Sequence, residues 1–88
     1  MASLSDAVYL SAIGYCAGRG GRKDEAVVYH RKAAELDPSS TMLSDLGWSL
    51  VESGAYSEAR DVLHRALAED PSNVRACANL DYLKSVAR

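Results

Sequence analysis

Residues 43–71 read LSDLGWSLVESGAYSEARDVLHRALAEDP, and the fold is predicted mainly from this segment. Large side chains at positions 43, 46 and 50, with a glycine at 47, recur at the spacing of one helical face. A second such face follows at positions 59, 63, 66 and 67. Between the two faces Gly54 can adopt a positive φ, and Pro71 cannot continue a helix. The stretch predicts two packed helices, with Gly47 where the second helix comes close.

The same spacing occurs once before this stretch and begins again after it. The earlier copy contains Leu10-x-x-Ile13-Gly14-x-x-Ala17 and then Ala26-x-x-x-His30-x-x-Ala33, closed by Asp37-Pro38. The interval from Pro38 to Pro71 equals the interval from Ala33 to Ala66, so the two copies share one period. The later copy begins with Cys77-x-x-Leu80 and carries Asp81 in the glycine position. A polar residue there suits a terminal helix that no further helix covers.

This pattern resembles the tetratricopeptide repeat (TPR) family, in which a helix with a Leu-Gly pair precedes a helix with Ala, a large residue, Ala and Pro. The resemblance implies an all-α fold, a short right-handed α-solenoid of antiparallel helix pairs with five helices. It implies a single domain over residues 1–88, with repeat one at 7–39, repeat two at 40–73 and a capping helix at 74–87. An unrelated five-helix bundle is the alternative.

The helix ends are predicted from capping residues and helix breakers. We expect helices at about 6–17, 23–36, 42–52, 56–69 and 74–86. Ser39-Ser40 and Ser72-Asn73 are the expected caps of the third and fifth helices. Three glycines between residues 18 and 21 predict that the first interhelical loop is longer and looser than the turn at 52–55.

Composition and charge favour a small domain that binds neither nucleic acid nor a membrane. The net charge is -2 over 88 residues, which gives no basic surface for phosphates. No apolar run approaches the length of a membrane span. The opening residues MASLSD lack the basic and apolar regions of a secretory signal, and two cysteines are too few for a disulfide scaffold. We therefore expect a cytoplasmic chain without a cofactor.

A stripe on the first helix of each predicted pair is the candidate binding surface, because the resemblance implies that these helices line a concave groove. The stripe carries an aromatic residue at the same place in each copy, at positions 15, 48 and 82. Such rings offer a large contact area with one polar atom each. The candidate partner-binding residues are Tyr15, Trp48, Tyr82, Ser11, Ser44, Val51, Arg75, Ala78 and Asn79.

The alternative is that the three rings only pack against neighbouring helices. Replacement of Trp48 by alanine separates the two interpretations. A ring free in the groove makes the change nearly neutral for stability, whereas a packed ring makes it cost about 3 kcal/mol or more.

The charges around the stripe argue against one type of ligand. TPR proteins that hold chaperone C-terminal carboxylates use Lys, Arg and Asn across the groove. Here only Arg75 and Asn79 sit at comparable places, and Asp45 stands where such proteins have Asn. Asp45 would repel a carboxylate, so the resemblance implies a different protein or peptide partner.

No pattern in the sequence predicts catalysis or a metal site. His30 aligns with a core position and is expected to be partly buried and hydrogen-bonded, and His64 is expected to face the outer surface. Neither histidine has a second pair of metal ligands at helical spacing. Cys16 and Cys77 fit small packing positions. We therefore expect a protein that is not an enzyme.

Three functions stay open. The first is an adaptor or scaffold that binds a protein or peptide in the groove. The second is a self-associating structural module, in which a homodimer covers the apolar outer face of the first helix at Leu4, Ala7 and Val8 or exchanges helices across residues 18–22. The third is an auxiliary domain of a larger enzyme or secretion assembly, which the sequence does not separate from the first.

Overall fold

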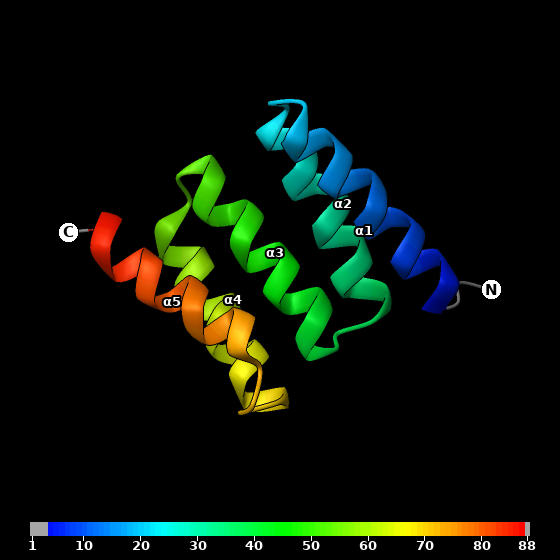
Figure 1. Cartoon of the computed structure of the whole chain (residues 1–88). Coiled ribbons are helices and arrows are strands. Elements are labelled where there is room, and N and C mark those ends of the chain that lie inside the picture. Colours follow the sequence, from blue (N-terminus) through cyan, green and yellow to red (C-terminus); the bar gives the residue numbers. More distant parts are fainter. Residues whose placement is uncertain (1–3, 88) are drawn as a thin grey trace.

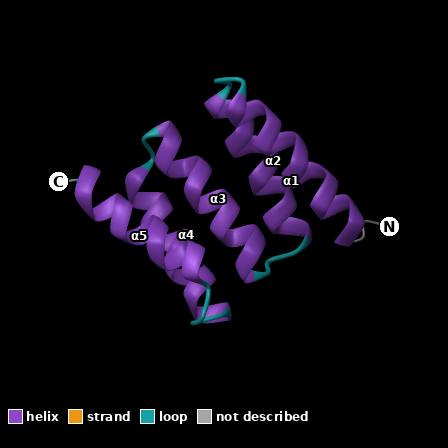
Figure 2. Cartoon of the chain, in the orientation of Figure 1, coloured by secondary structure: helices purple, strands orange, loops and turns teal. Residues whose placement is uncertain are grey.

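Five helices follow one another along the chain in the computed structural model, which describes residues 4–87 and the side chains of residues 6–87 (Figure 1). The helices are α1 (Leu4–Arg19), α2 (Lys23–Leu36), α3 (Ser40–Ser53), α4 (Tyr56–Glu69) and α5 (Val74–Val86). Within the described residues no strand occurs (Figure 2). The all-α class and the five helices are confirmed. The bounds predicted for α2, α4 and α5 match, and α1 and α3 extend beyond theirs.

The helix ends repeat the same local geometry from one copy of the pattern to the next. The chain leaves α2 at Asp37 (φ -142°, ψ 91°) and α4 at Asp70 (φ -147°, ψ 97°). Both residues are extended, as a following proline requires. Ser39 Oγ accepts a hydrogen bond from the Met42 amide, and Asn73 Oδ1 accepts one from the Ala76 amide. Ser39 and Asn73 are therefore the N-caps of α3 and α5, as predicted.

The two turns inside the helix pairs also share one geometry. Gly21 has φ +82° and Gly54 has φ +87°, a region that favours glycine. The residue after each glycine donates its amide five residues back, from Arg22 to the Ala17 oxygen and from Ala55 to the Leu50 oxygen. The glycine-rich loop is longer, as predicted, since residues 20–22 separate α1 from α2 whereas residues 54–55 separate α3 from α4. It is not more open at its closure, because the same backbone hydrogen bond closes both turns.

Two glycines let the helices of each pair approach closely. A Cβ added to Gly47 would lie 2.5 Å from Leu63 Cδ2, and one added to Gly14 would lie 2.9 Å from His30 Nε2. The predicted role of Gly47 is confirmed. His30 of α2 thus packs against α1 as Leu63 of α4 packs against α3, so the two residues occupy equivalent positions.

Helix α3 lies at the centre of the packing. It contacts α2, α4, α5 and α1, while α1 packs mainly on α2 and α4 also packs on α5. The N-terminal and C-terminal helices lie at opposite sides of the molecule (Figure 1). The buried core cluster consists of Ala7, Ala33, Ala34, Met42, Leu43, Leu46, Leu50, Val51, Ala59, Val62, Leu63, Ala66, Ala76 and Leu83. Since α1 and α5 each touch α3 but flank it, their exposed faces and α3 leave an open cleft.

Candidate binding cleft

The largest cleft described in the structure has a volume of about 680 Å³ and is named the central cleft. It lies over α3, with α1 on one side and the start of α5 on the other. Most of its lining is uncharged. The lining residues are Val8, Ser11, Ala12, Tyr15, Cys16, His30, Thr41, Met42, Asp45, Trp48 and Arg75. Four of the nine predicted binding residues, namely Ser11, Tyr15, Trp48 and Arg75, are among them.

Asp45 joins the three helices that border the central cleft. Ser11 Oγ on α1 donates to Asp45 Oδ2 at 3.1 Å, and Arg75 Nη2 on α5 donates to Asp45 Oδ1 at 2.9 Å. The Asp45 side chain is 17% exposed and that of Arg75 is 68% exposed. Both oxygens of the Asp45 carboxylate thus accept a hydrogen bond within the chain. The sequence suggested that the negative charge of Asp45 would repel an anion, but Arg75 offsets this charge.

The predicted row of aromatic rings forms in part. Trp48 and Tyr82 are in contact, with ring centroids 5.4 Å apart and planes tilted by 58°. Tyr15 lines the central cleft with Trp48 and is 62% exposed, and its ring lies 5.9 Å from the guanidinium carbon of Arg19. Tyr82 borders an adjoining cavity of about 220 Å³ that also reaches Trp48. Trp48 is therefore shared between the cleft surface and packing against α5.

Two predicted binding residues are not accessible. Ser44 is 1% exposed and Val51 is 4% exposed. Helix α3 is central and contacts α1, α2, α4 and α5. More of its surface is therefore buried than the surface of a helix in an isolated pair. Placing these two residues in an open groove was wrong. Ala78 and Asn79 belong to α5 but do not line the central cleft.

His30 lies at the base of the central cleft and of a neighbouring cavity of about 240 Å³. It is 7% exposed, and its Nδ1 atom is buried without a hydrogen-bond partner among the described residues. Burial lowers the pKa of His30, and the negative charges of Asp45 and Glu52 on α3 act in the opposite direction. The predicted burial is confirmed, whereas the predicted hydrogen bond is not found at Nδ1.

The prediction from the helical stripe missed several residues that line the central cleft. Ala12, Cys16, Thr41 and Met42 extend the cleft along α1 and α3, and Asp45 crosses it. Cys16 and Cys77 are exposed, so assigning them to packing positions was wrong. One signal for Asp45 was present in the sequence, since Ser11 and Arg75 fall on the two flanking first helices and can donate hydrogen bonds to a carboxylate. His64 is exposed, as predicted.

Between residues 4 and 87 no group of three or more His, Cys, Asp or Glu side chains could hold a metal ion. No described helix combines the length and apolar character needed to cross a membrane. No protein-family model matches the chain, and no curated protein matches it. The geometry of the central cleft is therefore the main guide to function.

Proposed function

We propose that this chain is a protein- or peptide-binding module that holds a segment of its partner in the central cleft. In this proposal the five helices form a short TPR-like solenoid of antiparallel pairs, with α1, α3 and α5 on the inner face and α5 as the cap. The observation that carries the proposal is the 680 Å³ cleft, whose lining comes almost entirely from those three helices. Helical repeat proteins use concave surfaces of this kind to bind partners.

The lining favours a partner segment with apolar or aromatic side chains. Tyr15 and Val8 are 62% and 59% exposed at the α1 side, and Trp48 lies opposite them on α3. Desolvation of exposed rings contributes strongly to binding at protein interfaces. Asp45 is already paired with Ser11 and Arg75, so the cleft presents no unpaired buried charge to the partner. The proposal assigns no catalytic residue, cofactor or metal, and places the protein in the cytoplasm.

The test is selection of cleft-binding peptides from a displayed random library, followed by affinity measurements with variants. Tyr15→Ala is expected to weaken binding of the selected peptides by about tenfold or more, because it removes an exposed ring from the cleft. Tyr9→Ala is the matched control. Tyr9 is on the same helix and is 67% exposed, but it does not line the cleft.

Equal losses for Tyr15→Ala and Tyr9→Ala, or a library from which no cleft-dependent peptide is recovered, would contradict the proposal. Trp48→Ala is a poorer probe, since Trp48 also packs against Tyr82 and its loss changes stability as well as binding.

A second candidate function is self-association through α1. Tyr9 is 67% exposed and does not line the central cleft, so its ring lies on the outer surface of this helix. Ala7 does not contribute, because it is fully buried, and the side chain of Leu4 lies outside the described residues. Light scattering that gives twice the monomer mass, and returns to the monomer mass in Tyr9→Ala, would favour this function over the first.

A further inference from the structure

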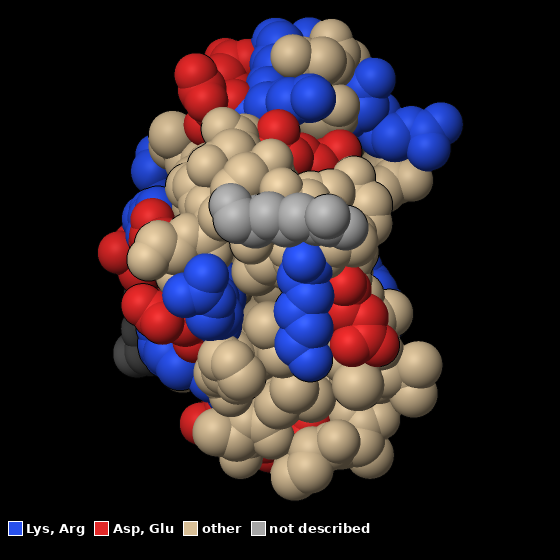
Figure 3. Space-filling view, turned by 90° about the vertical axis from the view of Figure 1, so that its left-hand side faces the viewer, with Lys and Arg blue, Asp and Glu red and all other residues tan. Residues whose placement is uncertain are grey.

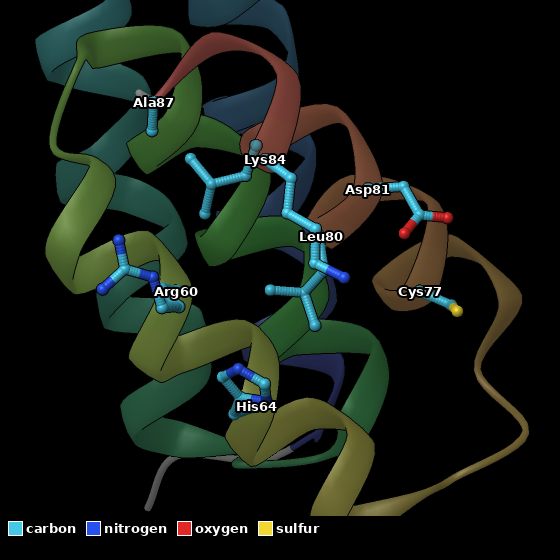
Figure 4. A pocket seen from close by; sticks show the side chains of 8 residues that line it. Arg60, His64, Cys77, Leu80, Asp81, Lys84 and Ala87 are labelled. Carbon is cyan, nitrogen blue, oxygen red and sulfur yellow. The ribbon is translucent and has the colours of Figure 1, made fainter.

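A second cleft lies between α4 and α5, away from the central cleft, and is named the end cleft. Its volume is about 300 Å³. The lining residues are Arg60, His64, Cys77, Leu80, Asp81, Leu83, Lys84 and Ala87. In Figure 4, Arg60 and His64 on α4 and Leu80 and Lys84 on α5 stand on the two sides of the cleft, while Asp81 and Cys77 project from the side of α5 away from α4.

The chain itself contains a covered version of this surface. The equivalent positions one repeat earlier on α3 are packed under α4, which reaches α2 only through side chains. Leu46 and Leu50 are 4% and 1% exposed, whereas their counterparts Leu80 and Lys84 are half-buried and exposed. The difference is that α4 covers α3, while no described helix covers α5 in the same way. The packing of α4 on α3, with its side-chain contact to α2, therefore serves as a template for what the end cleft would bind.

The template interface contains one specific ion pair. Arg31 on α2 donates two hydrogen bonds to the carboxylate of Glu58 on α4. This contact raises the pKa of Arg31 and lowers the pKa of Glu58, since each group stabilises the charged form of the other. The position equivalent to Arg31 in the second repeat is His64, which faces the end cleft. An acidic side chain from a covering helix would meet that position as Glu58 meets Arg31.

The end cleft carries the charge that such a helix requires. Arg60 and Lys84 set two positive charges against the single carboxylate of Asp81, although the chain as a whole has a net charge of -2. Among residues 6–87 no hydrogen bond or ion pair involves Arg60, His64 or Lys84. Seen from the α5 side, two groups of basic side chains are separated by uncharged surface, and acidic side chains lie directly beside one of these groups (Figure 3). Leu80 and Ala87 supply partly buried apolar groups between them.

We infer that the end cleft binds an acidic amphipathic helix of a partner protein, which packs on α5 and reaches α4 through its side chains, as α4 packs on α3 and reaches Arg31 of α2. Asp81 sets one further requirement. It replaces the glycine whose added Cβ would lie 2.5 Å from Leu63, so the bound helix has a small residue where α4 has Leu63. The ligand is thus a helix with an acidic residue in its first turn, followed five positions later by a small one.

The test uses a synthetic peptide of residues 55–70 with Leu63→Ala, acetylated and amidated at its ends, because α4 is the helix that covers the template. Binding is followed by NMR chemical-shift changes in the full chain at peptide concentrations up to the millimolar range. The expected changes are confined to α4 and α5, around Arg60, His64, Leu80 and Lys84. A peptide that also carries Glu58→Lys is expected to bind about tenfold more weakly, since the ion pair becomes a repulsion.

The matched protein variant is His64→Glu, which alters the exposed side chain at the position equivalent to Arg31 and leaves the core unchanged. It is expected to prefer the Glu58→Lys peptide to the Glu58 peptide, which reverses the order seen with the native chain. Absence of shift changes at millimolar peptide, changes located in the central cleft, or equal affinities for the two peptides would each overturn the inference. So would changes that depend on protein concentration without peptide, because a second copy would then be the occupant.

Discussion

The first helix pair, α1–α2, and the second, α3–α4, share the geometry of their turns and helix ends and differ in their buried side chains. Both pairs close their turn with a positive-φ glycine and leave their second helix through an extended aspartate. At the closest approach of the two helices, however, the first pair places His30 and the second places Leu63. Among residues 6–87 the buried Nδ1 atom of His30 has no hydrogen-bond partner, whereas Leu63 is fully buried.

The turn, cap and breaker residues thus determine the shape of each pair, while the buried position determines how well the pair is stabilised. A buried imidazole nitrogen without a hydrogen bond costs about 1–3 kcal/mol relative to a satisfied one. The first pair therefore contributes less to stability than the second. It is also the pair that places a titratable group at the base of the central cleft.

The largest expected effect comes from giving the second pair the residue of the first. Leu63→His removes a fully buried apolar side chain and introduces polar atoms next to Gly47. We expect a loss of about 3 kcal/mol or more in the free energy of unfolding, measured by urea denaturation. The exposed neighbour His64 is the control, and His64→Ala is expected to change stability by less than about 0.5 kcal/mol. A loss below about 1 kcal/mol for Leu63→His would mean that the two positions are interchangeable.

The next largest effect on stability is expected at Gly47 and Gly14, which contact Leu63 and His30. A Cβ at Gly47 meets Leu63 Cδ2 at 2.5 Å and Cγ at 2.6 Å, whereas one at Gly14 meets His30 ring atoms at 2.9 Å. We expect Gly47→Ala to destabilise the fold by about 1–3 kcal/mol and Gly14→Ala to destabilise it less. Thermal unfolding of both variants gives the comparison, and a larger loss for Gly14→Ala would contradict it.

Changing His30 to leucine should make the first pair resemble the second. The substitution removes the unpartnered Nδ1 atom, so we expect the unfolding free energy to rise by about 1 kcal/mol at neutral pH. The His30 pKa is lowered in the folded chain, so below the ordinary value near 6.5 the unfolded state binds more protons than the folded state. His30 should therefore reduce stability as the pH falls below that value and have no further pH effect above it.

The measurement is urea denaturation of the native chain and His30→Leu across the acidic pH range. The difference in stability between the two proteins should widen as the pH falls from about 6.5 and then level off below the folded-state pKa. A difference that stays constant with pH would show that the charges of Asp45 and Glu52 balance the effect of burial.

Much of this comparison was predictable from the sequence, because it depends on residues with strong local preferences. Pro38 and Pro71 end helices whatever surrounds them, and glycine tolerates the close approach at position 47. The burial of Ser44 and Val51 was not predictable in the same way. Angular position on a helix defines a face, but how many neighbours cover that face depends on the packing of all five helices.

The partial assembly of the candidate site has a similar cause. The repeat period placed Tyr15, Trp48 and Tyr82 on matching helices, and the contact between Trp48 and Tyr82 followed. The bridge through Asp45 depends on the length and direction of side chains from three helices. A repeat period contains no information about such non-repeating polar contacts.

The smallest expected effect concerns the link between the two pairs. Arg31 on α2 and Glu58 on α4 form a paired ion contact, but their side chains are 42% and 44% exposed. Water and salt screen such a pair, so a double-mutant cycle with Arg31→Ala and Glu58→Ala should give a coupling energy of about 0.2–1 kcal/mol that decreases in high salt. A coupling energy above about 2 kcal/mol that is insensitive to salt would mean that this contact, rather than the apolar core, joins the two pairs. The apolar alternative is favoured because Leu43 and Leu46 on α3 and Val62 on α4 are buried in the same core cluster as Ala33 and Ala34 on α2.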